Sequence, residues 1–376
     1  MHAAIYVQHL LGSGHLVRMR LLASALHAAG SRVTLISGGS FPGDAEYEVI
    51  RLPVLKTRPG DFLTLLDHDE RPVDDDWKAA RRDRLVACLE ALRPDLLILE
   101  TWPFGRRQLE FEILPMLDCV TGWSRPPLLV TSIRDVLQQR TRVRRMEALD
   151  RVRQYLSLVL VHGDPALLDL SPSFPEHRDI ACPIRYTGYM DQEAGPQRTS
   201  EGRDEVIVSA GGGAVGDHLL ATAAEAALEQ TERRWRILVG PRVSEARLRD
   251  WQSLHCDRLI VETNRADFSA MLTHCHASVS QFGYNTAVDL LRANCPSVVV
   301  PYESDGETEQ ATRARIFADK GRVWVLRETG LSAGTLLAEV TRASRDALAR
   351  DFPRVQLNGA ENSVGILQRL HQRMRP

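Results

Sequence analysis

Two patterns of apolar and polar positions alternate along the chain. Short apolar runs rich in β-branched residues predict strands, and longer segments with apolar residues three and four positions apart predict helices. In the first half, strands are expected at 3–8, 32–37, 48–52, 96–100, 128–132 and 158–162, and helices at 16–29 and 77–92. The segment 55–76 contains proline and aspartate and is expected to be a loop or a mobile segment. Strands that alternate with helices predict a parallel sheet.

The alternation is interrupted once and then starts again. Residues 191–202 are polar, contain proline and glycine, and have no apolar period, which is typical of a linker between domains. Further strands are expected at 205–209, 235–239, 259–262, 277–281 and 297–300, and helices at 217–230 and 360–373. The pattern therefore predicts an α/β protein with a domain at 1–190, a linker at 191–202, a second domain at 203–358 and a C-terminal helix at 359–376.

Composition narrows the functional classes. The 376 residues carry 47 Lys+Arg and 49 Asp+Glu, a net charge of −2, which argues against a protein that mainly binds nucleic acid phosphates. No run approaches 18 uninterrupted apolar residues, and no secretory signal is visible at the start. The six cysteines include no C-x-x-C pair. We expect a cytoplasmic protein with no bound metal.

Two segments could suggest a metal, and both have a plainer interpretation. His274-Cys275-His276 has apolar neighbours, and alternate residues of a strand point to opposite faces. Asp74-Asp75-Asp76 is interpreted as part of a polar loop rather than as a metal-binding D-x-D motif. Neither segment changes the expectation that the site contains no metal.

The first motif with chemical interest is Gly12-Ser13-Gly14-His15, between the first strand and the first helix. Glycines let the backbone approach a ligand, and a helix N-terminus offers N–H groups. A neutral His15 could take a proton from a hydroxyl. The alternative is a tight turn with a histidine that only caps the helix. Val17 replaces the last glycine of the dinucleotide motif G-x-G-x-x-G, which argues against a dehydrogenase.

The second motif is the glycine-rich loop 209–216, between a strand and the helix at 217–230. Its glycines Gly211, Gly212, Gly213 and Gly216 could hold a diphosphate with their backbone N–H groups. The alternative is a turn that packs a helix closely on a strand. The lysine of a nucleotide-hydrolase P-loop is absent, which excludes that class.

Two more strand-to-helix turns carry polar residues. The segment 280–286 contains Gly283, and Asn285 or Thr286 could cap the following helix or hold a phosphate near its start. Asp289 could complement the helix dipole or accept hydrogen bonds from a ribose diol. The acidic loop 301–310 leads into another helix, where Glu309 and Gln310 could bind sugar hydroxyls or simply be solvated.

These four segments together resemble GT-B glycosyltransferases, and the well-known similar family is the MurG-type N-acetylglucosaminyltransferases, which have the glycosyltransferase family 28 type of C-terminal domain. The likeness covers roughly residues 205–325 and, in the first half, mainly residues 5–37. The segments 103–107 and 132–135 resemble an uncharacterised bacterial branch of predicted MurG-like transferases. The resemblance implies two Rossmann-like domains, with parallel sheets facing across a cleft that contains the site.

The resemblance also implies a role for individual residues. His15 would be the acceptor-side base or would help to stabilise an oxyanion, within an acceptor loop formed by Gly12, Ser13, Gly14 and Arg18. Glu309 and Gln310 would contact the donor sugar, and Asp289 would bind the ribose where the family usually has glutamate. The nucleotide-binding residues would be Gly211, Gly212, Gly213, Gly216, Asn264, Arg265, Gly283, Tyr284, Asn285, Thr286 and Asp289.

The implied reaction is transfer of a sugar, such as a hexosamine, from a UDP-sugar to an acceptor, with inversion and without metal. No cofactor other than the donor is expected. The acceptor is not identified; a lipid-linked molecule and a saccharide are both considered. Gly12-x-Gly14-His15-x-x-Arg18 also resembles nucleotide-sugar hydrolases of the PseG type, in which His15 would activate water. A non-catalytic nucleotide-sugar-binding protein is the third alternative.

A basic cluster at 140–145, Arg-Thr-Arg-Val-Arg-Arg, raises the question of partners. The plainer interpretation is a solvated helix face. The alternative is contact with an anionic acceptor, such as a lipid-linked phosphate, or weak peripheral contact with the inner face of a membrane. No aromatic residues are interleaved with the arginines, so a nucleic acid is not expected.

Overall fold

The computed structural model describes residues 1–10, 14–58, 61–191, 199–210, 216–229, 232–240, 243, 245–304, 306–346 and 354–374. The chain divides into two compact units. The first comprises residues 1–165, 169–190 and 358–376, and the second comprises 166–168 and 191–357. Residues 192–198 of the expected linker lie outside the described residues, and the rest of that segment belongs to the second unit.

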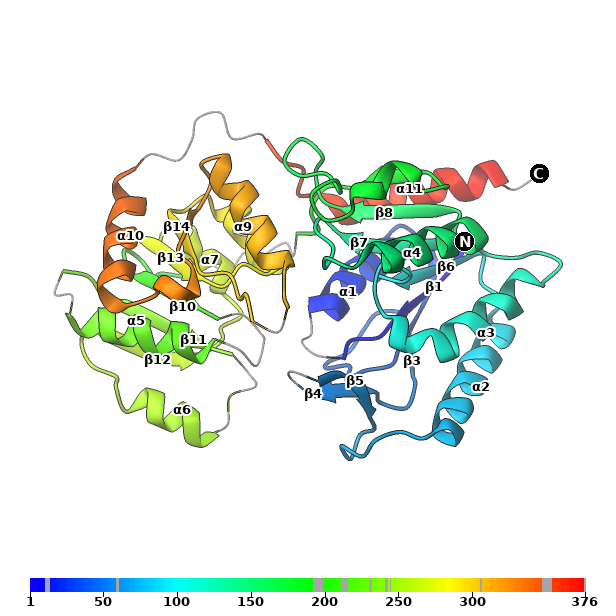
Figure 1. The fold of residues 1–376 in the computed structure, drawn as a ribbon, viewed down its shortest axis with the longest axis horizontal. Helices are drawn as coiled ribbons and strands as arrows, with labels where there is room; N and C mark the ends of the chain where they lie inside the picture. Colours follow the sequence, from blue (N-terminus) through cyan, green and yellow to red (C-terminus); the bar gives the residue numbers. More distant parts are fainter. Residues whose placement is uncertain are drawn as a thin grey trace. The chain divides into compact units, whose positions relative to one another are not determined.

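The first unit is built on a parallel sheet with the strand order β3-β2-β1-β6-β7-β8-β9 (Figure 1). Its strands are β1 (His2–Val7), β2 (Arg32–Ser37), β3 (Glu48–Arg51), β6 (Leu96–Glu100), β7 (Leu128–Arg134), β8 (Leu158–His162) and β9 (Ile184–Tyr186). The helices are α1 (Gly14–Ala28), α2 (Asp75–Leu92), α3 (Glu110–Thr121), α4 (Arg142–Tyr155) and α11 (Gly359–Met374), with short 3₁₀ turns η1 (Arg107–Leu109) and η2 (Pro175–Asp179).

Helices cover both faces of this sheet, which explains why its strands are apolar almost throughout. On β1, Ala3 and Ile5 pack in one cluster with Leu22 of α1 and Leu367 of α11. The alternate residues Ala4 and Tyr6 pack in the other cluster, with residues of α2, α3 and α4. Successive side chains of a strand point to opposite faces, so one strand contributes to both apolar layers.

The second unit has a parallel sheet of order β12-β11-β10-β13-β14-β15. Its strands are β10 (Val206–Ser209), β11 (Trp235–Val239), β12 (Leu259–Thr263), β13 (Ala277–Ser280), β14 (Ser297–Val299) and β15 (Trp324–Val325). The helices are α5 (Asp217–Glu229), α6 (Glu245–Gln252), α7 (Phe268–Leu272), α8 (Tyr284–Ala293), α9 (Glu309–Asp319) and α10 (Ala333–Arg345), with the turn η3 (Glu328–Gly330). Helices α5 and α10 pack on one face of the sheet (Figure 1). The predicted α/β class and the two Rossmann-like units are confirmed.

Two expectations about the segment 55–76 are wrong. The strands β4 (Lys56–Arg58) and β5 (Asp61–Leu66) form an antiparallel pair where only a loop was expected. Asp74–Asp76 do not lie in a loop, because they begin helix α2. The Asp74 carboxylate accepts a hydrogen bond from the Trp77 N–H at 2.8 Å and so caps that helix.

Each sheet reverses its direction of growth at one place. In the first unit the chain moves outward from β1 through β2 and β3, and then returns to pair β6 with the other side of β1. In the second unit the same reversal lies between β10 and β13. Ligands of open α/β sheets bind beyond the carboxyl ends of the strands at such a switch point. The two switch points are therefore the places where functional side chains are expected.

In the part of the chain that the structure describes, no helix is both long enough and apolar enough to cross a lipid bilayer.

Candidate active site

The switch point of the first unit contains a paired histidine and glutamate. His15 lies in the first turn of α1, which follows β1, and Glu100 is the last residue of the neighbouring strand β6. The Nδ1 atom of His15 lies 2.6 Å from Oε1 of Glu100. The Glu100 carboxylate is fully buried, whereas the His15 side chain is 19% exposed. The imidazole therefore has one buried partner and remains accessible from outside.

Further polar groups hold the Glu100 carboxylate in place. Its Oε1 atom also accepts hydrogen bonds from Arg18 and from the Thr101 hydroxyl, and the Nε atom of Arg106 lies 3.6 Å from Oε2. Arg18 lies one turn beyond His15 on α1, and its side chain is fully buried. Arg18 and Glu100 therefore form an ion pair that is completely buried in the first unit.

The charges around this pair favour a neutral histidine. Burial lowers the pKa of His15 well below its usual value. The positive charges of the nearby Arg134 and Arg106 lower this pKa further, whereas the negative charge of Glu100 raises it. Burial alone would raise the pKa of Glu100, but His15, Arg18 and Arg106 together hold it well below its usual range. Because an ionised carboxylate can only accept, Nδ1 of His15 carries the proton that it shares with Glu100. The Nε2 atom is then left as a base.

The loop that follows Glu100 has an uncommon backbone. Thr101 and Arg106 both have a φ of 66°, in the left-handed region that non-glycine residues seldom adopt. The buried rings of Trp102 and Phe104 anchor this loop, since Trp102 packs edge-on against Tyr155 and Phe104 edge-on against Phe174. Strained residues of this kind persist where the surrounding structure fixes them, often at functional sites.

A second buried histidine lies at the same edge of the sheet. His162 ends β8, and its ring nitrogens lie 2.7 Å from the Ser132 hydroxyl and 2.9 Å from the Thr187 hydroxyl. Burial lowers the pKa of His162 well below its usual value, and Arg18 adds to this effect. With both nitrogens engaged and no exposure, His162 is a structural residue that supports the carboxyl end of β7.

The glycine motifs of the two switch points are described only in part. Gly12 and Ser13, and the loop residues Gly211, Gly212 and Gly213, lie outside the described residues. Gly216 follows β10 with a φ of 129°, and a Cβ atom there would lie 2.4 Å from the Cβ of Ala210. Only glycine fits this position, which brings the start of α5 close to the end of β10.

The turn after β13 leads into α8 without a side-chain cap. Gly283 is the N-cap residue and helix α8 has no side-chain cap hydrogen bond, so the capping alternative for Asn285 or Thr286 is wrong. Tyr284, Asn285 and Thr286 form the first turn of the helix, and Tyr284 is buried. A Cβ atom at Gly283 would meet no atom within 4 Å. The N–H groups of this turn are thus not used by a capping side chain.

Asp289 lies on α8 and faces α7. Its Oδ1 atom accepts a hydrogen bond of 2.6 Å from the Ser269 hydroxyl. Burial raises the pKa of Asp289 to about 6, although the bond from Ser269 acts in the opposite direction. A carboxylate with a single hydroxyl donor retains further capacity to accept hydrogen bonds.

Gln310 connects the turns that follow β13 and β14. Its Oε1 atom accepts hydrogen bonds from the backbone N–H of Phe282 at 2.9 Å and of Tyr302 at 3.2 Å. The carboxylate of Glu307 caps α9 by accepting hydrogen bonds from the N–H groups of Glu309 and Gln310. Gln310 therefore has a positioning function that the sequence did not indicate.

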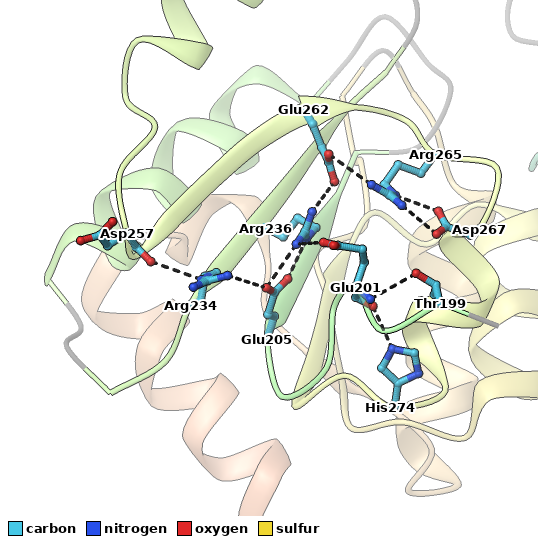
Figure 2. Close-up of polar contacts among 10 residues, drawn as sticks. All are labelled: Thr199, Glu201, Glu205, Arg234, Arg236, Asp257, Glu262, Arg265, Asp267 and His274. Atoms are coloured by element: carbon cyan, nitrogen blue, oxygen red, sulfur yellow. Dashed lines mark hydrogen bonds and ion pairs between the residues drawn. The ribbon is translucent and has the colours of Figure 1, made fainter. Parts of the chain in front are cut away.

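Arg265 is held in a network of ions at the end of β12. Its guanidinium makes two bonds of 2.8 Å to Asp267 and lies 3.5 Å from Glu262. The neighbouring Asn264 is exposed, and its N–H donates to the carbonyl of Val239 at 3.0 Å. Figure 2 shows that Glu262 also binds Arg236, which lies among Glu201, Glu205 and Glu262.

Sequence reasoning missed Glu100, Arg106 and Arg134 as parts of the site. Glu100 is separated from His15 by 85 positions, and only the pairing of β1 with β6 brings them together. One signal was present: Glu100 ends the run Leu-Leu-Ile-Leu-Glu, and a charge at the end of a buried strand is uncommon. Among the described residues no group of three or more potential metal ligands is found.

Comparison with known protein families gives one match. Residues 206–364, which include most of the second unit and the start of α11 in the first unit, match the model of the glycosyltransferase family 28 C-terminal domain. A curated relative from Rhodospirillum centenum is the UDP-N-acetylglucosamine–N-acetylmuramyl-(pentapeptide) pyrophosphoryl-undecaprenol N-acetylglucosamine transferase. It is 30% identical over 80 residues, which are 21% of this chain and 21% of the relative. The chain thus matches only about a fifth of the length of that relative.

Solved structures resemble the chain over its whole length. The calicheamicin glycosyltransferase CalG4 matches with a TM-score of 0.66 and 16% identity, over 100% of this chain and 99% of that one. MurG from Acinetobacter baumannii matches with a TM-score of 0.60 and 14% identity over 99% of both chains. The glycosyltransferase VinC, solved in complex with dTDP, gives 0.60 and 15% identity, over 99% of this chain and 100% of that one. The chain therefore has the GT-B fold that the sequence predicted.

Proposed function

We propose that this chain, whose second unit contains a glycosyltransferase family 28 C-terminal domain, transfers a sugar from a nucleoside diphosphate sugar to a hydroxyl of an acceptor. His15 is the base that removes the acceptor proton, and Glu100 orients its imidazole. The second unit binds the donor. We further propose a UDP-sugar as the donor, a hexosamine as one candidate sugar, and inversion at the transferred carbon.

The observation that carries the proposal is the His15–Glu100 pair at the first switch point. A partly exposed neutral imidazole whose Nδ1–H binds a buried carboxylate presents Nε2 as a proton acceptor. When His15 takes up the acceptor proton, the adjacent Glu100 stabilises the imidazolium that forms. The activated acceptor oxygen then attacks the sugar carbon on the side opposite the leaving diphosphate, which inverts that carbon.

The features that support donor binding lie at the second switch point. The uncapped first turn of α8 offers backbone N–H groups and the positive end of a helix dipole to a diphosphate. Asp289 is proposed to accept hydrogen bonds from the ribose, and Glu309 and Gln310 to contact the sugar. These groups would stabilise the leaving diphosphate as its charge develops, and we propose that no metal is required.

A transferase agrees better with the surroundings of His15 than the hydrolase alternative does. In a hydrolase of the type considered, Arg18 would orient a phosphate or a sugar. The side chain of Arg18 is fully buried and contacts Glu100, so its role in this proposal is to position that carboxylate. Release of free sugar without acceptor, at a rate that an added acceptor does not increase, would support the hydrolase instead.

The first prediction concerns donor class. Titration of the purified protein with UDP, dTDP, GDP, CMP and ADP should show saturable binding of UDP in preference to the others, with and without EDTA. dTDP is the most informative competitor, because VinC was solved with that nucleotide. Preference for dTDP would change the proposed donor, and binding that EDTA abolishes would contradict metal independence. No binding of any nucleotide would contradict the proposed function itself.

A second prediction concerns pH. Because the pKa of Asp289 is raised to about 6, its carboxylate is ionised at neutral pH and becomes protonated as the pH falls through that value. The ionised form accepts charge-assisted hydrogen bonds from the ribose hydroxyls, which are stronger than hydrogen bonds to the protonated carboxyl group. Affinity for an intact UDP-sugar should therefore fall by up to about tenfold between about pH 7.5 and pH 5, because a carboxyl group with a pKa of about 6 is mostly protonated at the lower pH.

An intact nucleotide sugar is used in that titration because a terminal phosphate itself titrates near pH 6. Asp289→Asn should bind weakly at both pH values, with most of the pH dependence lost. Asp319→Asn is the matched control, since Asp319 lies on the exposed side of α9 and pairs with Arg315. A wild-type pH profile in Asp289→Asn would remove Asp289 from the nucleotide site.

A further inference from the structure

The first unit contains a pocket that the proposed function does not yet use. It has a volume of about 480 Å³ and lies between the loop after β6, the segment after β7 and helix α4. The α4 residues that line it include Arg144, Ala148 and Arg151, whose spacing places them on one face of the helix. Pockets that enclose small molecules have volumes in the range of about 300–1,000 Å³, so this one could hold a complete small ligand.

The pocket has an apolar floor. Phe104, Leu137 and Phe174 line it and are almost completely buried, with 6%, 4% and 4% of their surface exposed. Phe104 and Phe174 contact each other edge to face, with ring centroids 5.2 Å apart. Both rings belong to the core of the first unit. This floor favours an aromatic or aliphatic group of limited size.

The rim of the pocket is polar, in contrast to the apolar floor, and carries more positive than negative side chains. Six arginines line the pocket: Arg106, Arg107, Arg140, Arg144, Arg145 and Arg151. The carboxylates that line it are Glu110 and Glu147, and Glu147 is shared by Arg107 at 3.8 Å and Arg144 at 3.2 Å. Glu176, outside the lining, pairs with Arg145. Arg140 has no ion-pair partner among the described residues.

Arg106 joins this pocket to the candidate catalytic pair. It lines the pocket, and its Nε atom lies 3.6 Å from Oε2 of Glu100, which binds His15. The Nε and Nη2 atoms of Arg106 are buried and have no hydrogen-bond acceptor. Buried donors of this kind are usually satisfied by a partner that occupies the site.

We propose that this pocket binds the acceptor, and that the acceptor is a compact molecule in which a phosphate or carboxylate group is attached to an aromatic or aliphatic body. The arginine rim pairs with the anionic group, and the Phe104–Phe174 floor packs against the apolar body. Guanidinium groups suit such anions because they donate two parallel hydrogen bonds. The term acceptor rests on the proposed function, whereas the binding chemistry rests on the pocket alone.

The test measures binding, so it does not require the true acceptor. Benzyl phosphate contains both chemical parts, and inorganic phosphate and benzyl alcohol contain one each. By calorimetric titration benzyl phosphate should bind saturably and at least about tenfold more tightly than either part, because each part of the pocket contributes. Affinity equal to that of inorganic phosphate would overturn the proposal, since the apolar floor would then contribute nothing.

Two double variants on the same segment locate the binding. Arg140→Gln with Arg144→Gln removes two exposed rim charges and should weaken benzyl phosphate binding at least about tenfold. Arg142→Gln with Arg153→Gln removes two charges from helix α4 that do not line the pocket, and should leave the affinity nearly unchanged. Equal losses in both variants would show only a response to net charge and would overturn the proposal. Thermal unfolding of each variant checks that it remains folded.

The link to His15 has its own readout. Arg106 is one of the charges that lower the pKa of His15, so an anion bound beside Arg106 should raise that pKa. NMR titration of the His15 imidazole with and without benzyl phosphate measures this change. An unchanged pKa would show that the occupant does not reach the catalytic pair, and would contradict its assignment as the acceptor.

Two further comparisons distinguish a membrane lipid from a free small molecule as the source of the anion, and distinguish failure of the pocket proposal from failure of the proposed function. Phosphatidylglycerol vesicles that bind in a rim-dependent manner, with no saturable binding of benzyl phosphate, would identify a membrane contact and overturn the pocket proposal. Protein that binds UDP but not benzyl phosphate would overturn this inference and leave the proposed function standing. Protein that binds benzyl phosphate but no nucleotide would support the pocket and contradict the proposed function.

Discussion

Replacing His15 by alanine should lower kcat about 10²–10⁴-fold, the range expected when a positioned general base is removed. Nucleotide affinity should hardly change, because the proposed nucleotide site lies in the second unit. The physical reason is that Nε2 of His15 is the proton acceptor that Glu100 orients through Nδ1. Steady-state kinetics with the donor that the titration identifies, together with nucleotide binding by the same variant, provides the measurement.

His27→Ala is the matched control for this variant. His27 lies at the other end of α1 and contacts the Tyr47 ring, so its loss should leave kcat unchanged. Equal losses of kcat and of nucleotide affinity in His15→Ala would assign His15 to binding rather than to catalysis. In the wild-type protein the acid limb of kcat/KM should lie below pH 6.5. Burial and Arg134 hold the pKa of His15 below that value, and the rate is lost only when the imidazole becomes protonated.

The second large effect concerns stability. Arg236→Met should lower the free energy of unfolding of the second unit by about 3–5 kcal/mol, the usual cost of removing one partner from a buried ion pair. Arg236 is 3% exposed and binds Glu205, Glu262 and Glu201 (Figure 2). Burial alone would lower the pKa of Arg236, but the bonds to Glu205 and Glu262 raise it above its usual value. Without Arg236 the nearly buried Glu205 carboxylate keeps Arg234, at 3.6 Å, as its one cationic partner among the residues that the structure describes.

Denaturant-dependent hydrogen exchange measures this loss locally, in peptides that contain β10, β11 and β12. Arg249→Met serves as the control in the same unit, because Arg249 and Glu245 form an exposed pair with side chains 69% and 91% exposed. Such pairs contribute only about 0–1 kcal/mol. A loss in Arg236→Met as small as that in Arg249→Met would mean that the apolar part of the methionine side chain compensates for the lost ion pairs.

The sequence predicted most of the strands because they are buried along nearly their whole length, and such strands are apolar runs with clear ends. It failed at β4 and β5, where an antiparallel pair forms from residues with a mixed pattern, and pairing rather than periodicity decides the structure. His15 could be predicted because it follows a local glycine motif. Glu100 could not be assigned, because its role depends on the position of β6 beside β1, which no local pattern encodes.

At the second switch point the sequence predicted which residues lie in the turns, but not the hydrogen bonds that connect those turns. The glycine turn before α8 and the carboxylate of Asp289 were recognised from their spacing. The bonds from Phe282 and Tyr302 to the Gln310 amide were not, because they join two turns that are 20 positions apart along the chain. The rim of the pocket illustrates the same limit: the basic cluster at 140–145 was visible, but Arg106 and the phenylalanine floor come from other segments.

Helix α11 limits how the molecule can be taken apart. It follows the whole second unit in sequence, yet its Leu367 packs in the apolar layer of α1 and β1. Its first residue, Gly359, approaches the backbone so closely that a Cβ atom would lie 2.5 Å from the carbonyl oxygen of Gly188. The gene therefore cannot be divided at one point into two independent domains. A fragment that ends at residue 190 lacks part of its own core, whereas excising residues 191–357 and joining residue 190 to residue 358 keeps that core complete.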